Sequence, residues 1–324
     1  MTEILVLDIQ IFILDWTVIM KMMEKAHRTK VNGTFIAWYE MGSGTPLIFI
    51  HGFHDTHSVW NKVAPLLADD FRVIMLDLPG SGLSDRPDKN YTLSWYSRMI
   101  IDWMDECCIE SAHVCGHSFG GGIAQWMLLK GRNRINRLAL IAPGGFGREV
   151  GMWLKPATFP VLGRQFTPLV VRYIIPALMR FFPDLFGNRS SEEINQLAKL
   201  NRIPGSDRAF QRSLEAVINP FGQYMQTRQR IWEVDTLPPI ALFWGEKDPI
   251  LPIKHGRSMV AESTGITLTT YMKCGHFPHL VASNVFAHDL KTFLQDPYRP
   301  PATFCFKTKK HKGILKSLKT KMAA

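Results

Sequence analysis

The sequence predicts an α/β protein in which short buried strands alternate with helices. One observation is a strand–turn–helix pattern: the apolar run Ala112–Cys115 leads into Gly-His-Ser-Phe-Gly at residues 116–120, and apolar residues then recur at helical spacing over Gly121–Lys130. A second is that later short apolar runs end in loops that carry an acidic residue or a histidine. The length of 324 residues and the 46% of hydrophobic residues suit one large domain with an insertion.

Residues 1–25 form an apolar N-terminal segment outside this pattern. The run Ile4–Met20 contains Asp8 and Asp15, and a charged side chain at the centre of a membrane helix costs about 2.5–3.5 kcal/mol, so a spanning helix is not expected. The acidic Glu3 and the lack of a basic leader argue against a signal peptide. An amphipathic helix on a surface and a translation start at one of the later methionines both remain as alternatives.

The fold itself is expected to start near residue 26. Thr34–Tyr39 is the first predicted strand, and the fully apolar Pro46–Ile50 is a buried one. Asp77 ends a further strand that precedes the Ser-containing turn. Because of this position in the chain, we interpret Asp77 as a carboxylate that organises its own loop.

Ser118 is the candidate nucleophile. A serine held between glycines on a sharp strand-to-helix turn is typical of a nucleophile elbow. The turn forces a strained backbone on the serine, and the glycines at 116 and 120 let the strand and the helix approach closely. The hydroxyl then lies at the N-terminal end of a helix, where the helix dipole favours developing negative charge.

An acid and a histidine follow Ser118 in the chain. Ile240–Trp244 is a predicted strand with Asp248 in the loop after it, and Thr267–Met272 is another with His276 after it. Loops at the carboxyl ends of neighbouring parallel strands converge in space. We therefore expect Ser118, Asp248 and His276 to meet.

These three residue types support nucleophilic catalysis, because a serine hydroxyl needs a base and an imidazole needs a carboxylate to fix its tautomer. The other expected position for the acid, after Leu138–Ile141, has no carboxylate, which favours Asp248, with Glu246 as its nearest competitor. His279 is the competitor of His276, which is preferred because it follows its strand directly.

The oxyanion hole is expected to consist of two backbone N–H groups. The residue after the nucleophile, Phe119, supplies one, and Phe53, in the loop after Pro46–Ile50, supplies the other. His54, next in that loop, is a candidate contact for the substrate.

The chain resembles the α/β-hydrolase superfamily, in its serine-nucleophile branch. The segments that carry the resemblance are His51–Phe53, Asp77–Ser84, Gly116–Gly121, Trp244–Pro249 and Gly275–His279. The resemblance implies a mostly parallel eight-stranded sheet with helices on both faces and a helical cap inserted between its two halves. The domains that follow from it are a core over 26–143 and 236–298, a cap over 144–235 and a basic, disordered tail over 299–324.

The serine at the elbow separates the chain from epoxide hydrolases and haloalkane dehalogenases, which place Asp there, and from dienelactone hydrolases, which use Cys. The oxyanion loop is similar to those of small bacterial esterases, monoacylglycerol lipase-like enzymes and haloperoxidase-type esterases. The resemblance therefore implies a serine hydrolase that cleaves carboxylic esters of lipophilic or aromatic substrates through an acyl-enzyme. C–C bond hydrolysis, amide hydrolysis, perhydrolysis and a non-catalytic ligand-binding protein are the alternatives.

The net charge of +10 is concentrated at the C-terminus, where residues 307–321 hold seven lysines and no acid. A solvated disordered tail is one interpretation of this segment, and weak association with an anionic membrane surface is the other. The rest of the chain is nearly neutral, so no nucleic-acid partner is expected, and the oligomeric state is not predicted.

The five cysteines have no spacing typical of a zinc site and are read as reduced buried thiols, which is typical of a cytoplasmic protein. There is no phosphate-binding loop and no dinucleotide fingerprint, so neither a cofactor nor a metal is expected.

Overall fold

The computed structural model describes residues 26–159, 162–231 and 237–304. The expectations for residues 1–25 and for the lysine-rich stretch 307–321 lie outside these ranges. None of the helices within the described ranges is both long and apolar enough to cross a bilayer.

An eight-stranded, mostly parallel sheet forms the centre of the molecule, in the order β1-β2-β4-β3-β5-β6-β9-β11. β2 pairs antiparallel with both β1 and β4, and every other neighbouring pair is parallel. This confirms the predicted fold class. The strands are β1 (His27–Val31), β2 (Thr34–Met41), β3 (Thr45–Ile50), β4 (Phe71–Leu76), β5 (Ala112–His117), β6 (Ile135–Ile141), β9 (Ile240–Gly245) and β11 (Ile266–Tyr271).

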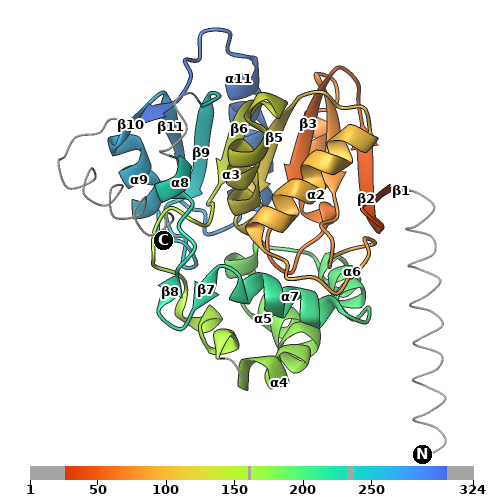
Figure 1. Ribbon diagram of the computed structural model, residues 1–324. Helices are drawn as coiled ribbons and strands as arrows, with labels where there is room; N and C mark the ends of the chain where they lie inside the picture. The colour runs from red at the N-terminus through yellow and green to blue at the C-terminus, as the bar shows by residue number, and fades with distance from the viewer. Residues whose placement is uncertain (1–25, 160–161, 232–236, 305–324) are drawn as a thin grey trace, which may run out of the picture.

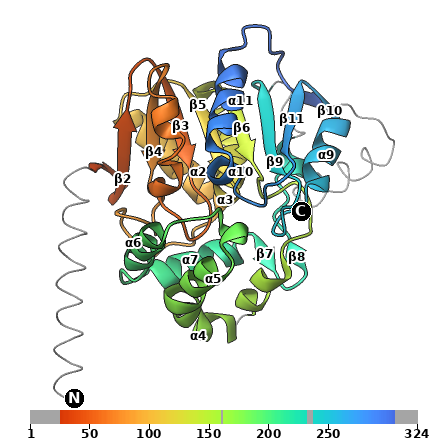
Figure 2. The ribbon, with the colours of Figure 1, turned by 180° about the vertical axis from the view of Figure 1, so that it is seen from behind.

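Helices cover both faces of the sheet. α2 (Leu93–Glu106) and α3 (Phe119–Gly131) lie in front of it in Figure 1, and α11 (Ser283–Gln295) lies in front of it in the reverse view of Figure 2. Thr92 caps α2 by accepting a hydrogen bond from the backbone N–H of Trp95. The remaining elements of the core are η1 (His57–Trp60), η2 (Ala64–Leu66), η3 (Arg132–Arg134), α9 (Lys254–Ala261), β10 (Ser263–Thr264), α10 (Pro278–Val281) and β12 (Thr303–Phe304).

Two apolar cores result, one on each face of the sheet, because side chains alternate along a strand. In β3, Ile48 and Ile50 pack into the core that contains Trp103 of α2. Leu47 and Phe49 of the same strand pack into the other core, which contains Phe286 of α11. The central strands are therefore apolar on both faces, as expected for a parallel sheet covered on both sides.

The chain between β6 and β9 folds largely into helices. In Figures 1 and 2 the helices of residues 162–215 lie below the sheet and face the end from which the site loops emerge. Ser190 and Glu193 form a capping box at the start of α6. The elements are η4 (Met152–Leu154), η5 (Pro156–Thr158), α4 (Leu162–Leu169), the π-helical η6 (Val170–Ile174), α5 (Ile175–Phe181), η7 (Pro183–Phe186), α6 (Ser191–Asn201), α7 (Ser206–Glu215), β7 (Ile218–Asn219), β8 (Gly222–Gln223) and α8 (Arg228–Ile231).

The disorder predicted from residue 299 is wrong for the first residues of that segment. β12 pairs antiparallel with β10, and the fully buried Ala302 forms a β-bridge with Leu237. A two-residue strand held by backbone hydrogen bonds has no side-chain periodicity, so no pattern in the sequence marks it.

Candidate active site

Ser118 lies on the turn between β5 and α3 with a φ of 53° and a ψ of −113°, which is a strained conformation for a residue with a side chain. Its N–H donates to the carbonyl of Ile141 at 2.9 Å, and its own carbonyl accepts from the N–H of Gly144 at 3.0 Å. A Cβ at Gly116 would lie 2.6 Å from the carbonyl oxygen of Gly120, so the strand and the helix can approach this closely only because glycine occupies position 116.

His276 and Asp248 lie side by side although 28 residues separate them in the chain. The Nδ1 atom of His276 is 2.7 Å from Oδ2 of Asp248, and both side chains are almost fully buried. The other carboxylate oxygen accepts hydrogen bonds from the N–H groups of Ile250 and Leu251 at 2.8 and 3.0 Å. With its proton on Nδ1, the imidazole has Nε2 available as an acceptor.

Ser118 and His276 line the same cavity, which has a volume of about 60 Å³. The wall opposite them consists of apolar side chains from the segment between β6 and β9, namely Leu154, Ile175, Met179, Phe186 and Phe210. A second cavity of about 30 Å³ also reaches Ser118 and is lined almost entirely by apolar groups, among them Leu93, Val150, Val217 and Met225. Ser118 therefore lies between two small apolar spaces.

The competing acid and base lie elsewhere. Glu246 accepts a hydrogen bond from the Thr270 hydroxyl at 3.1 Å and pairs loosely with Arg257 at 3.9 Å, both away from His276. His279 is fully buried, and its ring lies against those of Trp60 and His117. Burial lowers the pKa of His279 well below its usual value, so this histidine is neutral.

Phe53 and Phe119, the expected oxyanion donors, lie next to each other with their rings stacked at a centroid distance of 4.2 Å. Phe119 is the first residue of α3, where a backbone N–H has no acceptor within the helix. The loop that carries Phe53 contacts the turn directly: a Cβ at Gly52 would lie 3.2 Å from the Cβ of Ser118. Glycine at position 52 thus lets the loop of Phe53 lie directly against Ser118.

Asp77 organises its loop, as interpreted from the sequence. Its carboxylate accepts from the backbone N–H groups of His57 and Leu83 at 2.8 and 2.9 Å and lies 2.9 Å from Nδ1 of His57. Burial by itself would raise the pKa of Asp77, but the contacts with His57 and Leu83 hold it below the ordinary value. The carboxylate is therefore charged and structural.

A buried ion pair between Arg189 and Asp55 was not predicted. Nη2 of Arg189 is 2.5 Å from Oδ2 of Asp55, Nη1 is 3.3 Å from Oδ1, and each side chain is only 4% exposed. The guanidinium also lies over the ring of Phe277, the neighbour of His276, at 5.6 Å. The pair joins the segment before α6 to the loop of Phe53, and 134 residues of sequence separation leave no local signal for it.

His54 lines the cavity of Ser118, as its position in the loop suggested. Its backbone has a φ of 56°, and its Nε2 atom lies 3.4 Å from the amide nitrogen of Asn201 at the end of α6. Burial lowers the pKa of His54 to about 4, so the ring is neutral at pH 7. A neutral imidazole presents one donor and one acceptor to its surroundings.

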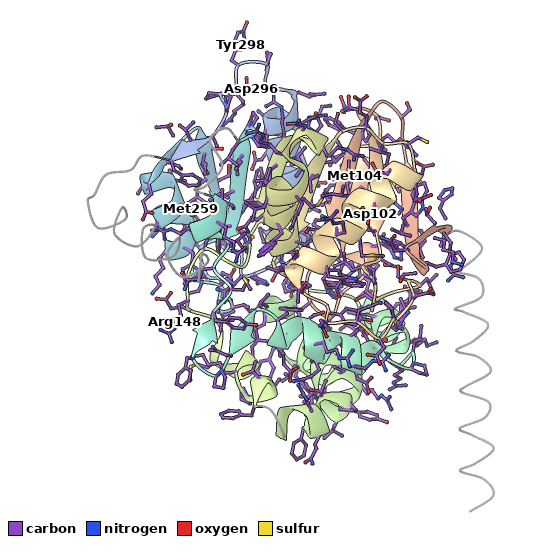
Figure 3. The ribbon with its side chains drawn as sticks, in the orientation of Figure 1. Asp102, Met104, Arg148, Met259, Asp296 and Tyr298 are labelled. Atoms are coloured by element: carbon purple, nitrogen blue, oxygen red, sulfur yellow. The ribbon has the colours of Figure 1, made fainter. Side chains whose placement is uncertain are left out.

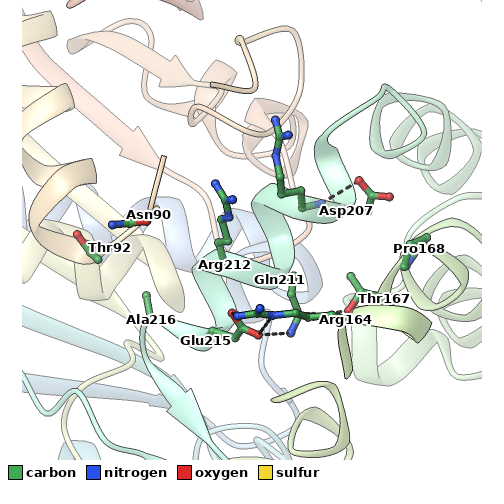
Figure 4. A pocket seen from close by; sticks show the side chains of 11 residues that line it. Asn90, Thr92, Arg164, Thr167, Pro168, Asp207, Gln211, Arg212, Glu215 and Ala216 are labelled. Atoms are coloured by element: carbon green, nitrogen blue, oxygen red, sulfur yellow. Dashed lines mark hydrogen bonds and ion pairs between the residues drawn. The ribbon is translucent and has the colours of Figure 1, made fainter. Parts of the chain in front are cut away.

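A larger pocket of about 690 Å³ lies on the outer side of α7 (Figure 4). Most of its lining residues are polar or charged, and neither Ser118 nor His276 belongs to it. Its arginines are engaged: Arg164 binds Glu215 at 2.9 Å and Arg212 binds Asp88. Among the described residues, no group of three or more His, Cys, Asp or Glu side chains could hold a metal ion. The cavity of Ser118 is thus the candidate site.

Comparison with known proteins agrees with this fold. Residues 45–283 match the family model described as alpha/beta hydrolase fold, which covers more than half of the chain. The chain belongs to the alpha/beta hydrolase family. An uncharacterized protein of Mycobacterium tuberculosis is 31% identical to this family member over 255 residues, which cover 76% of this chain and 74% of the relative.

Other relatives within the family are named for a particular hydrolase activity. The 2-hydroxymuconate semialdehyde hydrolase of Pseudomonas putida is 26% identical over 268 residues, covering 80% of this chain and 90% of the relative. The solved structure of a meta-cleavage product hydrolase from Pseudomonas fluorescens superposes with a TM-score of 0.66 at 23% identity, covering 85% of this chain and 99% of that one. The comparisons therefore support a hydrolase of the alpha/beta fold and leave the bond that it cleaves open.

Proposed function

We propose that this alpha/beta hydrolase cleaves carboxylic esters of lipophilic or aromatic substrates by serine catalysis. One observation carries the proposal: Ser118, on its strained turn, shares a cavity with His276, whose Nδ1 atom is 2.7 Å from the buried carboxylate of Asp248. A serine, a carboxylate and an imidazole in this chain order suit an activated nucleophile.

In the proposed mechanism the Ser118 hydroxyl attacks the ester carbonyl while Nε2 of His276 takes its proton. The carbonyl oxygen becomes an oxyanion that accepts hydrogen bonds from the N–H groups of Phe53 and Phe119. The imidazolium, stabilised by Asp248, then gives the proton to the departing alkoxide, and an acyl-enzyme remains. Water attacks this ester with His276 again as base, which releases the acid and restores the serine.

The two apolar cavities at Ser118 support a substrate with apolar groups on both sides of the reacting carbonyl. One cavity would take the acyl group and the other the alcohol. Their volumes of about 60 and 30 Å³ admit only small groups. A long acyl chain therefore requires movement of α5, the helix that carries both Ile175 and Met179, so we expect such a lid motion to limit turnover on large esters.

Cleavage of a C–C bond by the same residues is the second candidate. The similarity to a 2-hydroxymuconate semialdehyde hydrolase favours it, because that relative covers 80% of this chain. Three weaker alternatives use the same arrangement of residues: amide hydrolysis, perhydrolysis, and ligand binding without turnover. No further observation supports any of them.

Hydrolysis of p-nitrophenyl esters of increasing acyl length tests the proposal. Wild type should turn over the series, Ser118→Ala should fall to background, and Ser191→Ala, at an exposed serine on α6, should behave as wild type. If wild type is inactive on every ester yet a fluorophosphonate labels Ser118, the nucleophile is functional and the ester assignment is wrong. Turnover of a vinylogous diketone in that case would identify a C–C hydrolase.

A further inference from the structure

The outer surface of the helices between β6 and β9 is unusually apolar. Nine of the seventeen large hydrophobic side chains that are exposed among the described residues lie between Met152 and Leu185. Six of them form what we term the cap patch: Phe166, Leu169, Tyr173, Ile174, Phe181 and Phe182. Phe181 is 78% exposed, which is far from the buried position usual for a phenylalanine.

The cap patch belongs to a helical stretch that is apolar on opposite faces. α4, η6 and α5 follow one another from Leu162 to Phe181. Ile175 and Met179 on the inner face line the cavity of Ser118, whereas Phe166 and Tyr173 on the outer face are more than half exposed. A helix with apolar side chains on opposite faces is normally buried on both faces. We therefore expect a binding partner to cover the outer face.

The charge around the cap patch is positive. Residues 150–185 contain four basic side chains and one acidic side chain, Asp184. Arg164 and Arg172 pair with carboxylates, but Arg180 binds only the Pro176 carbonyl and the Asn195 amide oxygen, and Arg202 lies over the Tyr173 ring. Two positive charges thus border the cap patch without a carboxylate partner among the described residues.

We infer that the cap patch docks on a lipid bilayer that carries anionic headgroups. Aromatic and aliphatic side chains enter the boundary between headgroups and acyl chains, and arginines bind the anionic surface. A second copy of this chain fits less well, because a two-fold dimer through this surface would gather Arg180 and Arg202 of both copies, four arginines without carboxylate partners among the described residues, around one interface. The membrane is thus the partner that satisfies both the apolar and the charged groups.

Docking at this surface would place the bilayer against the helix whose other face forms the wall at Ser118. A lipophilic ester dissolved in the membrane then has only that helix between itself and the nucleophile. This consequence rests on the proposed ester hydrolysis, whereas docking itself does not. The two are therefore measured separately.

Vesicle binding by the full chain tests the inference. We expect co-sedimentation with vesicles of equal parts phosphatidylcholine and phosphatidylserine, and weaker binding to phosphatidylcholine alone. Phe166→Ser and Phe181→Ser should each weaken binding to the anionic vesicles by about tenfold, since each removes one buried phenylalanine from the interface. Tyr298→Ser is the matched control, because Tyr298 is 90% exposed and lies at the opposite end of the molecule from α4 (Figure 3).

Several results would overturn the inference. One such result is a wild type that binds no vesicles. Another is that the two phenylalanine variants bind as well as wild type, which would show that another segment is responsible. A dimer of wild type that Phe181→Ser converts to a monomer, without any change in vesicle binding, would show that a second copy covers the patch. A lowered melting temperature of the variants with unchanged vesicle binding would show that this chain covers the patch itself.

Discussion

The loops at the end of the sheet and the helices that cover them differ in which side chains they bury and which they expose. The loops bury charge and pair it closely, as in Asp248 with His276 and Asp77 with His57. The covering helices instead leave large apolar groups in solvent, with Phe181 as the extreme case. The first arrangement fixes atoms in place for chemistry, and the second leaves a surface for a partner.

The largest expected effect is on the loop side of this comparison. Asp248→Asn should lower kcat for ester hydrolysis by about 10⁴-fold, because an amide no longer fixes the imidazole tautomer or stabilises the imidazolium. Steady-state kinetics on a short p-nitrophenyl ester measures it. Glu246→Gln is the control and should keep wild-type kcat, and an equal loss in both variants would refute the assignment of the acid.

The ion pair between Arg189 and Asp55 joins the two regions. Arg189→Met leaves the Asp55 carboxylate buried without its partner and should reduce the free energy of unfolding by about 3–5 kcal/mol. Adding Asp55→Leu in the same protein should restore most of this loss, since an apolar pair leaves no unpaired charge. Denaturant titration of the three proteins provides the test, and a double variant no more stable than the single one would contradict it.

The neutral His54 predicts how stability depends on pH. Its pKa falls from 6.5 to about 4 on folding, so the unfolded chain binds more protons between these values and stability is lost as pH falls through that window. Between pH 7 and pH 5 the protonation of this histidine should lower the free energy of unfolding by about 2 kcal/mol.

Denaturant titrations of wild type and His54→Asn at the two pH values measure this contribution. Asparagine tolerates the positive φ of position 54 and has no group that titrates in this range. Wild type should therefore lose more stability than the variant on acidification. Equal losses in the two proteins would show that His54 is not the group responsible.

The smallest effect is expected on the apolar surface. Phe181→Ser should change the free energy of unfolding by no more than about 0.5 kcal/mol, because an exposed side chain contributes little to packing. Hydrolysis of a short ester in solution should also stay at the wild-type rate. A loss of several kcal/mol would mean that Phe181 packs within this chain and would remove the contrast between the two regions.

The sequence alone determined the strands and the order of the candidate residues. Short apolar runs such as Pro46–Ile50 are typical of buried strands in a parallel sheet, and glycines around Ser118 indicate a turn that requires glycine. The loops of Asp248 and His276 follow such runs, and the parallel sheet brings their side chains within 2.7 Å of each other. Local sequence patterns therefore predicted most of the fold and the residues of the candidate site.

The tertiary structure decided what depends on distant contacts. No local pattern predicts the pairing of Arg189 with Asp55, or the exposure of Phe166 beside the burial of Ile175 on one helical stretch. It also showed that residues 302–304 pair with other segments of the chain. Periodicity in a sequence reports which residues share a face, but which face is covered, and by what, depends on segments far away in the chain.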